Sequence, residues 1–276
     1  MRVTVLGSGS RGNAIVVDGA DGTLLIDAGF GRRALARRFA LAERRPEEVG
    51  ALLLTHEHVD HASGATAASD RWQWPVFAHA ETFTALSAMI GGSPVRRNVL
   101  SMTASTHIAG FDVVSVPVPH DARLCSAFVL TDRRTGARVG IALDLGHVPE
   151  HLPAALAHCD LLVVESNHDE RMLAQGPYPW ALKRRVGGPT GHLSNGTTAG
   201  LLAAVAHRGL RGVVLAHLSE TNNRPTTALE RSRQALRRAG WRREELFAAV
   251  QQRPSTPVTL AGAGATGGSD QLVLQL

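Results

Sequence analysis

Three histidines and an aspartate stand within six residues of one another, directly after a short apolar run. The run, Ala-Leu-Leu-Leu-Thr over residues 51–55, predicts a buried strand. It is followed by His56, His58, Asp60 and His61. Neutral imidazole and carboxylate groups are ligands of zinc, manganese and iron. A His-Glu-x-x-His zinc helix is excluded, because Asp60 stands where that pattern needs its second histidine. The segment therefore predicts a metal-binding loop, and the alternative is a histidine-rich polar surface loop.

Four ligands so close in sequence crowd the backbone if they all converge on one ion. A loop that turns into a helix can divide them, with His56 and His58 on one ion and Asp60 and His61 on a second. Two ions about 3.5–4 Å apart form the usual clamp of hydrolytic sites. We therefore expect two divalent ions as cofactors, zinc or manganese, with iron also open.

Other polar residues that end apolar runs are the candidates for further ligands. They are His120 after residues 116–119, Asp144 after residues 139–143 and His217 after residues 213–216. A carboxylate can bridge two ions, which suits Asp144. Each residue alone is as compatible with a structural role, but their order after the histidine cluster favours the ligand interpretation.

The composition limits the classes of protein that remain. Of the 276 residues 44% are hydrophobic and 19% are charged, so the chain can bury a sizeable core and is not an extended disordered chain. No apolar run approaches the roughly 18–20 residues of a membrane span, and the first ten residues lack the apolar core of a secretory signal. These features predict a cytoplasmic protein with no membrane partner. Cys125 and Cys159 have no paired spacing and predict no disulfide framework.

The net charge of +5 comes almost entirely from arginine, because Lys183 is the only lysine. A GC-rich genome would explain this bias without any function, and a polyanionic partner is also compatible with it. The densest cluster comprises Arg231, Arg233, Arg237, Arg238, Arg242 and Arg243. It predicts either the solvated face of a helix or a patch that binds nucleic acid.

The order of predicted elements indicates the architecture. Strands are expected at residues 2–7, 14–18, 23–27, 51–55, 111–118, 126–131, 139–144, 160–165 and 212–217, and helices at residues 32–43, 168–174, 195–207 and 226–239. Consecutive strands first and a mixed order later predict two packed sheets covered by helices, in one domain of residues 1–260. The Gly/Ala-rich residues 261–276 predict a mobile tail, in which residues 272–276 could dock as a strand.

Taken in order, the His-x-His-x-Asp-His cluster, a strand-end histidine, an aspartate and a final histidine resemble the metallo-β-lactamase superfamily. The resemblance extends from residues 26–29 (Ile-Asp-Ala-Gly) to His217, with no departure at a metal-ligand position. It implies an α/β fold, an αββα sandwich of two packed mixed sheets flanked by helices, with a two-metal site along one edge. Closer similarity to the YycJ/WalJ group, whose members resemble exonucleases acting on DNA from the 5′ end, is seen at residues 7–13, 120–122, 165–169, 176–180, 182–185, 191–195 and 216–219.

The resemblance implies a role for each matching residue. The first ion would be held by His56, His58 and His120, and the second by Asp60, His61 and His217, with Asp144 bridging both. Asp60 and Asp144 would orient a metal-bridging hydroxide that attacks phosphorus in line. Glu165 and His192 resemble a pair in RNase Z-type phosphodiesterases, in which the glutamate orients the histidine.

His192 also has a meaning in its own sequence context, just before a helix expected to start near Asn195. Ser194 or Asn195 can cap this helix, and its free N–H groups can bind an anion, so both residues are candidate substrate contacts. The imidazole could bind a phosphate oxygen or protonate a leaving alkoxide. The alternatives are a plain capping-region side chain for His192 and a buried partner of any nearby His or Arg for Glu165.

Smaller features carry narrower expectations. Asp27 is expected to support a ligand histidine or the Thr55 loop, with an N-cap as the alternative. Tyr178 and Trp180, rare aromatics in this chain, either pack in the interior, which is favoured, or stack a terminal base. The Gly-rich residues 8–13 predict a hairpin turn or, less favoured, an anion-binding nest.

The predicted function is a two-metal phosphodiesterase, with a 5′-to-3′ DNA exonuclease ranked first. The alternatives are a thioester or other ester hydrolase of the same fold, a small-molecule phosphodiesterase, and a metal-binding regulator without catalysis. Thioester hydrolases commonly have Gly-His-Thr around the third-motif histidine, whereas residues 119–121 are Pro-His-Asp. No inserted nuclease domain or tRNA-grasping arm is evident, which favours DNA over RNA as the nucleic-acid partner. The sequence does not indicate an oligomeric state.

Overall fold

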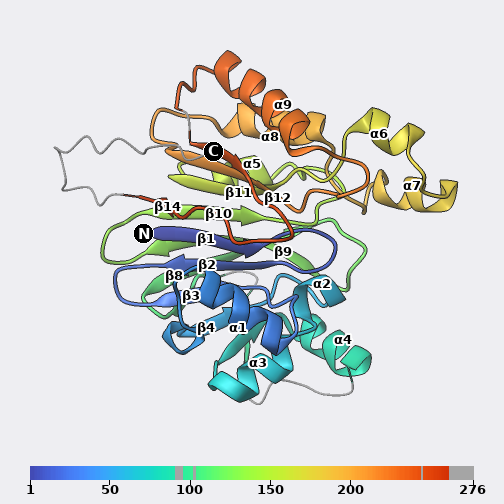
Figure 1. Cartoon of the computed structure of the whole chain (residues 1–276). Helices are drawn as coiled ribbons and strands as arrows, with labels where there is room; N and C mark the ends of the chain where they lie inside the picture. The colour runs from blue at the N-terminus through green and yellow to red at the C-terminus, as the bar shows by residue number, and fades with distance from the viewer. Residues whose placement is uncertain (91–95, 102–103, 244, 261–276) are drawn as a thin grey trace.

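Two β-sheets lie face to face, and helices cover their outer faces (Figure 1). The computed structural model describes residues 1–90, 96–101, 104–243 and 245–260, and within these residues each sheet has seven strands. The strand orders are β14-β1-β2-β3-β4-β5-β6 in the first sheet and β13-β12-β11-β10-β9-β8-β7 in the second. The predicted αββα sandwich is confirmed.

The first sheet is antiparallel at its start and parallel further on. It contains β1 (Arg2–Gly7), β2 (Ala14–Asp18), β3 (Thr23–Ile26), β4 (Ala51–Leu53), β5 (Val76–Ala78) and β6 (Arg97–Val99), with β14 (Val258–Thr259) beside β1. Its outer face is covered by α1 (Arg32–Leu41), α3 (Ala65–Trp72) and α4 (Ala80–Ile90), and a 3₁₀ turn occupies Pro46–Glu48 (Figure 1).

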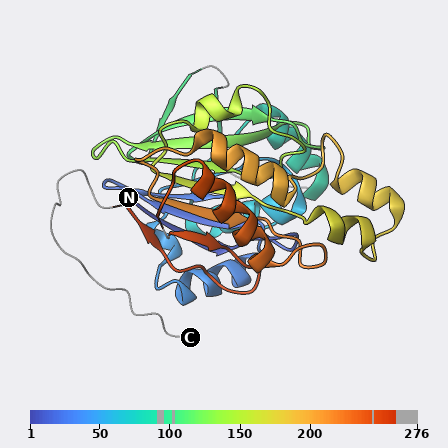
Figure 2. The same ribbon diagram turned by 90° about the horizontal axis from the view of Figure 1, so that it is seen from above.

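The second sheet is also mixed, with β10 to β13 parallel. It contains β7 (Thr106–Ile108), β8 (Phe111–Val118), β9 (Cys125–Asp132), β10 (Arg138–Ala142), β11 (Leu161–Glu165), β12 (Gly212–Ala216) and β13 (Leu246–Ala248). It is covered by α5 (Leu152–Leu156), α8 (Asn195–Val205) and α9 (Pro225–Arg238). The short helices α2 (Val59–Ala62), α6 (Glu170–Gln175) and α7 (Trp180–Val186) lie at one end of the sandwich, from which α6 and α7 project (Figures 1 and 2).

Strand residues of this chain are apolar on both faces because both faces are covered. In β11, Leu161 and Val163 belong to the core between the sheets, whereas Leu162 and Val164 pack towards the helices. β2 shows the same alternation, with Ile15 facing the other sheet. Successive side chains of a strand point to opposite faces, so a continuous apolar run fills two separate cores. Continuous apolar runs, rather than alternation of apolar and polar residues, are therefore the sequence signal of these strands.

The predicted strands and helices are present, within a few residues at their ends. The helix expected from residue 168 begins at Glu170, because the Asp169 side chain caps it by accepting from the N–H groups of Arg171 and Met172. Apart from the turn into a helix at Asp60 and His61, which α2 supplies, no element was expected between residues 56 and 110, where the structure also has α3, α4 and β5 to β7. The expectation for residues 261–276 lies outside the described residues, and the one-domain organisation stays a prediction. No helix among the described residues is long and apolar enough to cross a membrane.

Candidate metal centre

The predicted ligands converge at one end of the sandwich, where strands of both sheets end. The ligand atoms of His56, His58 and His120 lie within 4.8 Å of one another, and so do those of Asp60, His61 and His217. Asp144 stands between the two groups, because it forms one such cluster with His56 and His61 and another with His217. The structure thus brings together all seven side chains, in the two groups that the resemblance implies.

The division between the groups comes from the turn that follows β4. His58 immediately precedes α2, so Asp60 and His61 are carried by the helix while His56 stays on the loop. The segment behind α2 must approach it closely, since a Cβ at Gly29 would lie 1.7 Å from the carbonyl oxygen of Asp60. Only glycine permits this contact, which explains the Gly29 of the Ile-Asp-Ala-Gly motif.

Three polar residues of the site have left-handed backbone conformations. The φ values are 62° for Asp27, 57° for Asp144 and 53° for His217. Asp27 and His217 directly follow β3 and β12, and Asp144 follows β10 after one intervening residue. A positive φ is uncommon outside glycine and costs of order 1–3 kcal/mol. These strand ends therefore turn sharply, at an energetic cost that the surrounding structure must offset.

One group of ligands consists of histidines only. His56 is fully buried, and its Nε2 forms no hydrogen bond with any described residue. His120 donates its Nδ1–H to the carbonyl of Gly191 at 3.0 Å, which directs Nε2 towards His58. Burial lowers the pKa of His56 well below its usual value and also lowers the pKa of His120. Neutral imidazole is the ligand form of histidine, so three converging imidazoles with His56 Nε2 unpaired fit a divalent metal ion.

The other group combines histidines with carboxylates. His61 Nε2 lies 2.6 Å from Asp144 Oδ2, and His217 Nε2 lies 3.2 Å from Asp60 Oδ2. Burial acts to lower the pKa of both histidines, but the nearby carboxylates outweigh it. They raise the pKa of His61 well above its usual value and that of His217 to about 9. The same nitrogen and oxygen atoms are a suitable donor set for a second ion.

Asp27 holds the candidate ligand His61 and the start of the loop that carries His56 and His58. Its carboxylate accepts from the Thr55 N–H at 2.8 Å and lies 2.7 Å from His61 Nδ1. The carboxylate–histidine contact orients the ring so that Nε2 points into the site. The structure thus puts Asp27 in the predicted supporting position, and the N-cap alternative is wrong because α1 begins at Arg32.

Glu165 and His192 form a hydrogen-bonded pair beside the ligands. His192 Nδ1 lies 2.7 Å from Glu165 Oε1, while Glu165 Oε2 accepts the N–H groups of Leu145 and Leu193. Burial acts to raise the pKa of Glu165, but His192 and the hydrogen bonds lower it to about 2. Conversely, Glu165 and Asp144 overcome burial and raise the pKa of His192 well above its usual value. The pair is therefore a carboxylate and an imidazolium when no ion is bound.

A cavity of about 260 Å³ opens onto these groups. It is lined by Ser10, His58, Asp60, His120, Asp121, Asp144, Tyr178, Leu182, Arg185, Val186, Gly191, His192 and His217. The lining combines the metal-ligand candidates with residues of α7 and with Tyr178, which precedes it. Substrate entering here would meet both.

Comparison with known proteins agrees with this geometry. Residues 23–218 match the family model of the beta-lactamase superfamily domain. The chain belongs to the metallo-β-lactamase superfamily. It is 31% identical to a Bacillus anthracis protein named exodeoxyribonuclease YycJ, over 94% of this chain and 98% of that protein. It is 29% identical to exodeoxyribonuclease WalJ of Streptococcus pneumoniae serotype 2, strain D39 / NCTC 7466, over 80% and 83%.

The fold has a similar counterpart among solved structures. The metallo-β-lactamase fold protein YhfI from Bacillus subtilis superimposes with a TM-score of 0.67 at 17% identity, over 92% of this chain and 98% of that chain. As a metallo-β-lactamase superfamily member, the protein is a metal-dependent hydrolase, and its histidine and carboxylate clusters are the expected place for divalent ions. The sequence identities to YycJ and WalJ confirm the resemblance to that group.

Of the four residues predicted to contact substrate, the structure puts one in the lining of the cavity and three outside it. Tyr178 lines the cavity. Trp180 does not, and its side chain is 68% exposed, so the favoured expectation of interior packing is wrong for this residue. Ser194 caps α8 and Asn195 is buried, with hydrogen bonds to Ser166 and Asn223. Because their polar groups are engaged away from the cavity, neither is placed to contact substrate.

Two residues of the Gly-rich turn support the metal centre, which the sequence analysis missed. Ser8 Oγ accepts the N–H of His217 at 2.8 Å, and Asn13 Nδ2 lies 2.9 Å from His61 Nε2. Asn13 also accepts from Ser8 Oγ and the Gly9 N–H. The side chains of the turn thus organise its own backbone and two ligands. A polar Ser-x-x-x-x-Asn spacing across a Gly-rich turn was the available signal.

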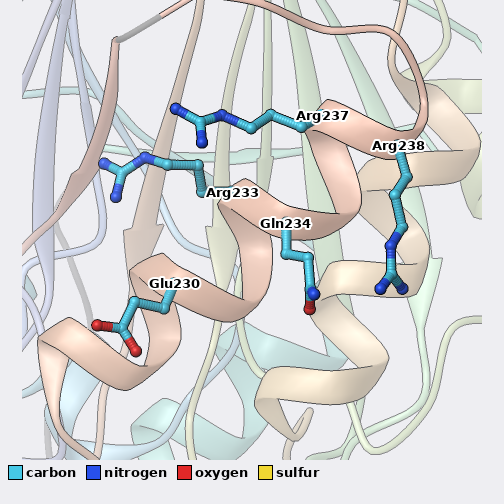
Figure 3. Close-up of a pocket in the computed structure, with 5 residues that line it drawn as sticks. All are labelled: Glu230, Arg233, Gln234, Arg237 and Arg238. Carbon is cyan, nitrogen blue, oxygen red and sulfur yellow. The ribbon is translucent and has the colours of Figure 1, made fainter.

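The late arginine cluster lies away from the cavity. Figure 3 shows Arg233 and Arg237 on one side of α9, while Gln234 and Arg238 point to the other side. With Glu230 they line a shallow hollow of about 440 Å³. These arginines form no ion pair within the described residues, as expected of the solvated helix face that the sequence analysis offered as one interpretation. None of them lines the cavity beside the candidate metal ligands.

Proposed function

We propose that this hydrolase is a phosphodiesterase that removes nucleotides from the 5′ end of DNA. The observation that carries the proposal is the His192–Glu165 pair, an acid placed on the cavity wall next to the predicted metal ligands. The curated relatives named exodeoxyribonucleases supply DNA as the substrate class. The 5′ polarity and action in the cytoplasm follow the expectations from the sequence.

The proposed metal ligands are those that the two clusters bring together. His56, His58 and His120 would hold one ion, and Asp60, His61 and His217 would hold the other, with Asp144 touching both. Zinc or manganese at these positions would supply Lewis-acid stabilisation of the phosphoryl oxygens. The carboxylate of Asp60, which lines the cavity, would orient the attacking water.

His192 is the proposed general acid. Glu165 engages Nδ1, so Nε2 is the nitrogen left to reach a substrate, and it has no hydrogen bond within the described chain. The raised pKa keeps a proton on the ring at neutral pH. A proton delivered to the departing 3′-oxygen would lower the barrier for an alkoxide that leaves poorly by itself.

The α7 side of the cavity is the proposed contact for the strand end. Tyr178 lines the cavity and Trp180 stands exposed on α7, with the Arg184 guanidinium 4.3 Å from the centre of its ring. Stacking on aromatic rings binds bases without sequence preference. We propose that one or both rings stack a base near the 5′ end.

The test is a direct comparison of substrates with the metal-loaded protein. Single- and double-stranded DNA labelled at the 5′ or 3′ end, RNA of the same sequence, bis(4-nitrophenyl) phosphate and a glutathione thioester would be assayed with Mn²⁺ or Zn²⁺. We expect mononucleotide release from 5′ ends that stops on chelation. Turnover of the thioester without cleavage of any phosphodiester would overturn the proposal in favour of an ester hydrolase. Cleavage of the nitrophenyl ester alone would indicate a small-molecule phosphodiesterase.

A further inference from the structure

The proposed reaction does not use Arg185, a cation that lines the cavity. Arg185, in the last turn of α7, is the one lysine or arginine among the described residues that line the cavity. All other charged groups there are histidines or carboxylates of the metal centre, together with Asp121. A phosphodiester chain that enters the cavity carries a negative charge at every linkage. Arg185 is the residue in the lining whose positive charge does not depend on pH, so it is a candidate contact for one of these phosphates.

Arg185 is held next to the histidine-only ligand group by one carboxylate. Its Nε donates to Asp121 Oδ2 at 2.6 Å, and Asp121 Oδ1 lies 3.3 Å from His120 Nε2. The guanidinium is therefore only one side chain away from a predicted metal ligand. Arg185 therefore lies near the candidate ligands without being one of them.

The contact with Asp121 uses only one edge of the guanidinium. Nη1 and Nη2 form no hydrogen bond with the described residues, and the Arg185 side chain is 63% exposed despite its fixed Nε. A guanidinium with its terminal nitrogens free can bind two oxygens of one phosphate in parallel. The carboxylate thus orients the group and leaves its phosphate-binding atoms available.

The small cavity limits which phosphate can reach Arg185. Ligand pockets usually measure about 300–1,000 Å³, and this one is smaller, so it accommodates little more than one nucleotide unit. If the linkage under attack lies at the metal ligands, the next phosphate of that nucleotide is its own 5′-phosphate. Tyr178 and Arg185 share the wall on which this end of the nucleotide would rest.

We propose that Arg185 binds the terminal 5′-phosphate of the substrate strand and so determines specificity for phosphorylated 5′ ends. This inference rests on the proposed function, which it deepens by naming the end group. The competing explanation is structural, namely that the Arg185–Asp121 pair only fastens α7 beside the metal centre.

Binding of two small nucleotides separates these explanations. Thymidine 3′,5′-bisphosphate carries both phosphates, whereas thymidine 3′-monophosphate carries only the one that would lie at the ions. Calorimetry with the metal-loaded protein should show tighter binding of the bisphosphate. Arg185→Ala should weaken bisphosphate binding by about 10- to 100-fold, the effect of losing a charge-assisted phosphate contact. The same variant should leave monophosphate binding and metal content close to wild type.

Two further variants make the test specific. Arg185→Lys keeps the charge but loses the two-pronged geometry, and we expect it to lie between wild type and Arg185→Ala. Arg208→Ala removes an exposed arginine beyond the far end of α8 and should change neither affinity. Equal weakening of both nucleotides by Arg185→Ala, or no wild-type preference for the bisphosphate, would overturn the proposal.

Activity then distinguishes failure of this inference from failure of the proposed function. Wild-type protein should prefer DNA with a 5′-phosphate over DNA with a 5′-hydroxyl through a lower KM. Arg185→Ala should abolish that preference, and its turnover of bis(4-nitrophenyl) phosphate, which has no terminal phosphate, should change far less than its turnover of 5′-phosphorylated DNA. Cleavage of both DNAs with equal KM would refute the 5′-phosphate site and retain the nuclease. An Arg185-dependent preference for the bisphosphate without any DNA cleavage would refute the nuclease and retain the phosphate site.

Discussion

The two halves of the metal centre use histidine in opposite ways. In the half formed by His56, His58 and His120, burial lowers the pKa of His56 and His120, and His56 Nε2 is left without a hydrogen bond in the described chain. In the other half, carboxylates raise the pKa of His61 and His217. The environment therefore favours the neutral form of His56 and His120 on one side, and the charged form of His61 and His217 on the other.

This difference indicates which half of the site needs a metal ion to satisfy its polar groups. The carboxylate half satisfies its charges internally, with His61 between Asp27 and Asp144. In the histidine half the carboxylates lie farther away, with His120 Nε2 at 3.3 Å from Asp121 and His56 Nε2 at 3.8 Å from Asp144. An ion would therefore complete the polar contacts of the histidine half but would have to displace protons from the other half.

Removing the one carboxylate that serves both halves should have the largest effect. Asp144→Ala should lose at least one ion and nearly all hydrolysis, because Asp144 lies in clusters with ligands of each group. Elemental analysis and phosphodiester turnover measure the two effects. Asp144→Asn is the closer control, since it keeps the shape and removes only the charge. A variant with full metal content and activity would remove Asp144 from the site.

His192 tests whether the acid beside the carboxylate half acts on substrate rather than on metal. His192→Ala should lower kcat by about 10²–10⁴-fold while leaving metal content and the melting profile near wild type. The loss should shrink for a nitrophenyl phosphodiester, whose leaving oxygen needs no proton. Glu165→Gln should give a milder form of the same pattern.

The outcomes for His192 discriminate among its roles. A loss of metal would make His192 a ligand, consistent with its lying in one cluster with Asp144, Glu165 and His217. An equal loss on good and poor leaving groups would leave phosphate binding as its function and exclude proton donation.

Substitution of Asp27 tests how far the carboxylate half depends on the group that orients His61. Asp27→Asn should weaken binding of one ion by about 10- to 100-fold, as is usual when the carboxylate behind a histidine ligand is neutralised. Metal titration followed by calorimetry should show one weakened and one unchanged site. Asp112→Asn, on the exposed part of β8, serves as the matched control. If both sites weaken equally, the two halves are more strongly coupled than their separate contacts indicate.

The smallest effect expected is on the pH dependence of stability in the metal-free protein. Unfolded histidine titrates near pH 6.5, whereas folded His217 titrates near 9. Its stabilisation is complete below about pH 6.5 and is lost as the pH rises through 9, at up to about 1.4 kcal/mol per pH unit for each retained proton. His56, with its lowered pKa, acts in the opposite direction and destabilises the fold as the pH falls below 6.5.

Denaturant unfolding of chelator-treated protein between pH 6.5 and 9 measures this dependence. The free energy of unfolding should fall across the range for wild type and should fall less for His217→Gln. A wild-type protein that gains stability with rising pH would contradict the assignment of charged histidines to the carboxylate half.

The sequence by itself determined the chemistry of the site and the type of fold. Apolar runs that end in His or Asp predicted both the strands and the ligands, because a strand buried on both faces needs a continuous apolar run and its end is where polar groups can emerge. The local spacing of His58, Asp60 and His61 also predicted their division between two groups, since a turn into a helix depends only on neighbouring residues.

Only the tertiary structure decided which distant residues act together. Asp121 meets Arg185 across 64 positions, and the Ser8 hydroxyl meets the His217 N–H across 209. The exposure of Trp180 likewise depends on how α7 projects from the sandwich (Figure 1). Such contacts are set by the packing of whole elements, and no local pattern of hydrophobicity or turn residues encodes them. For this reason the candidate ligands were visible in the sequence, whereas the role of Arg185 beside them was not.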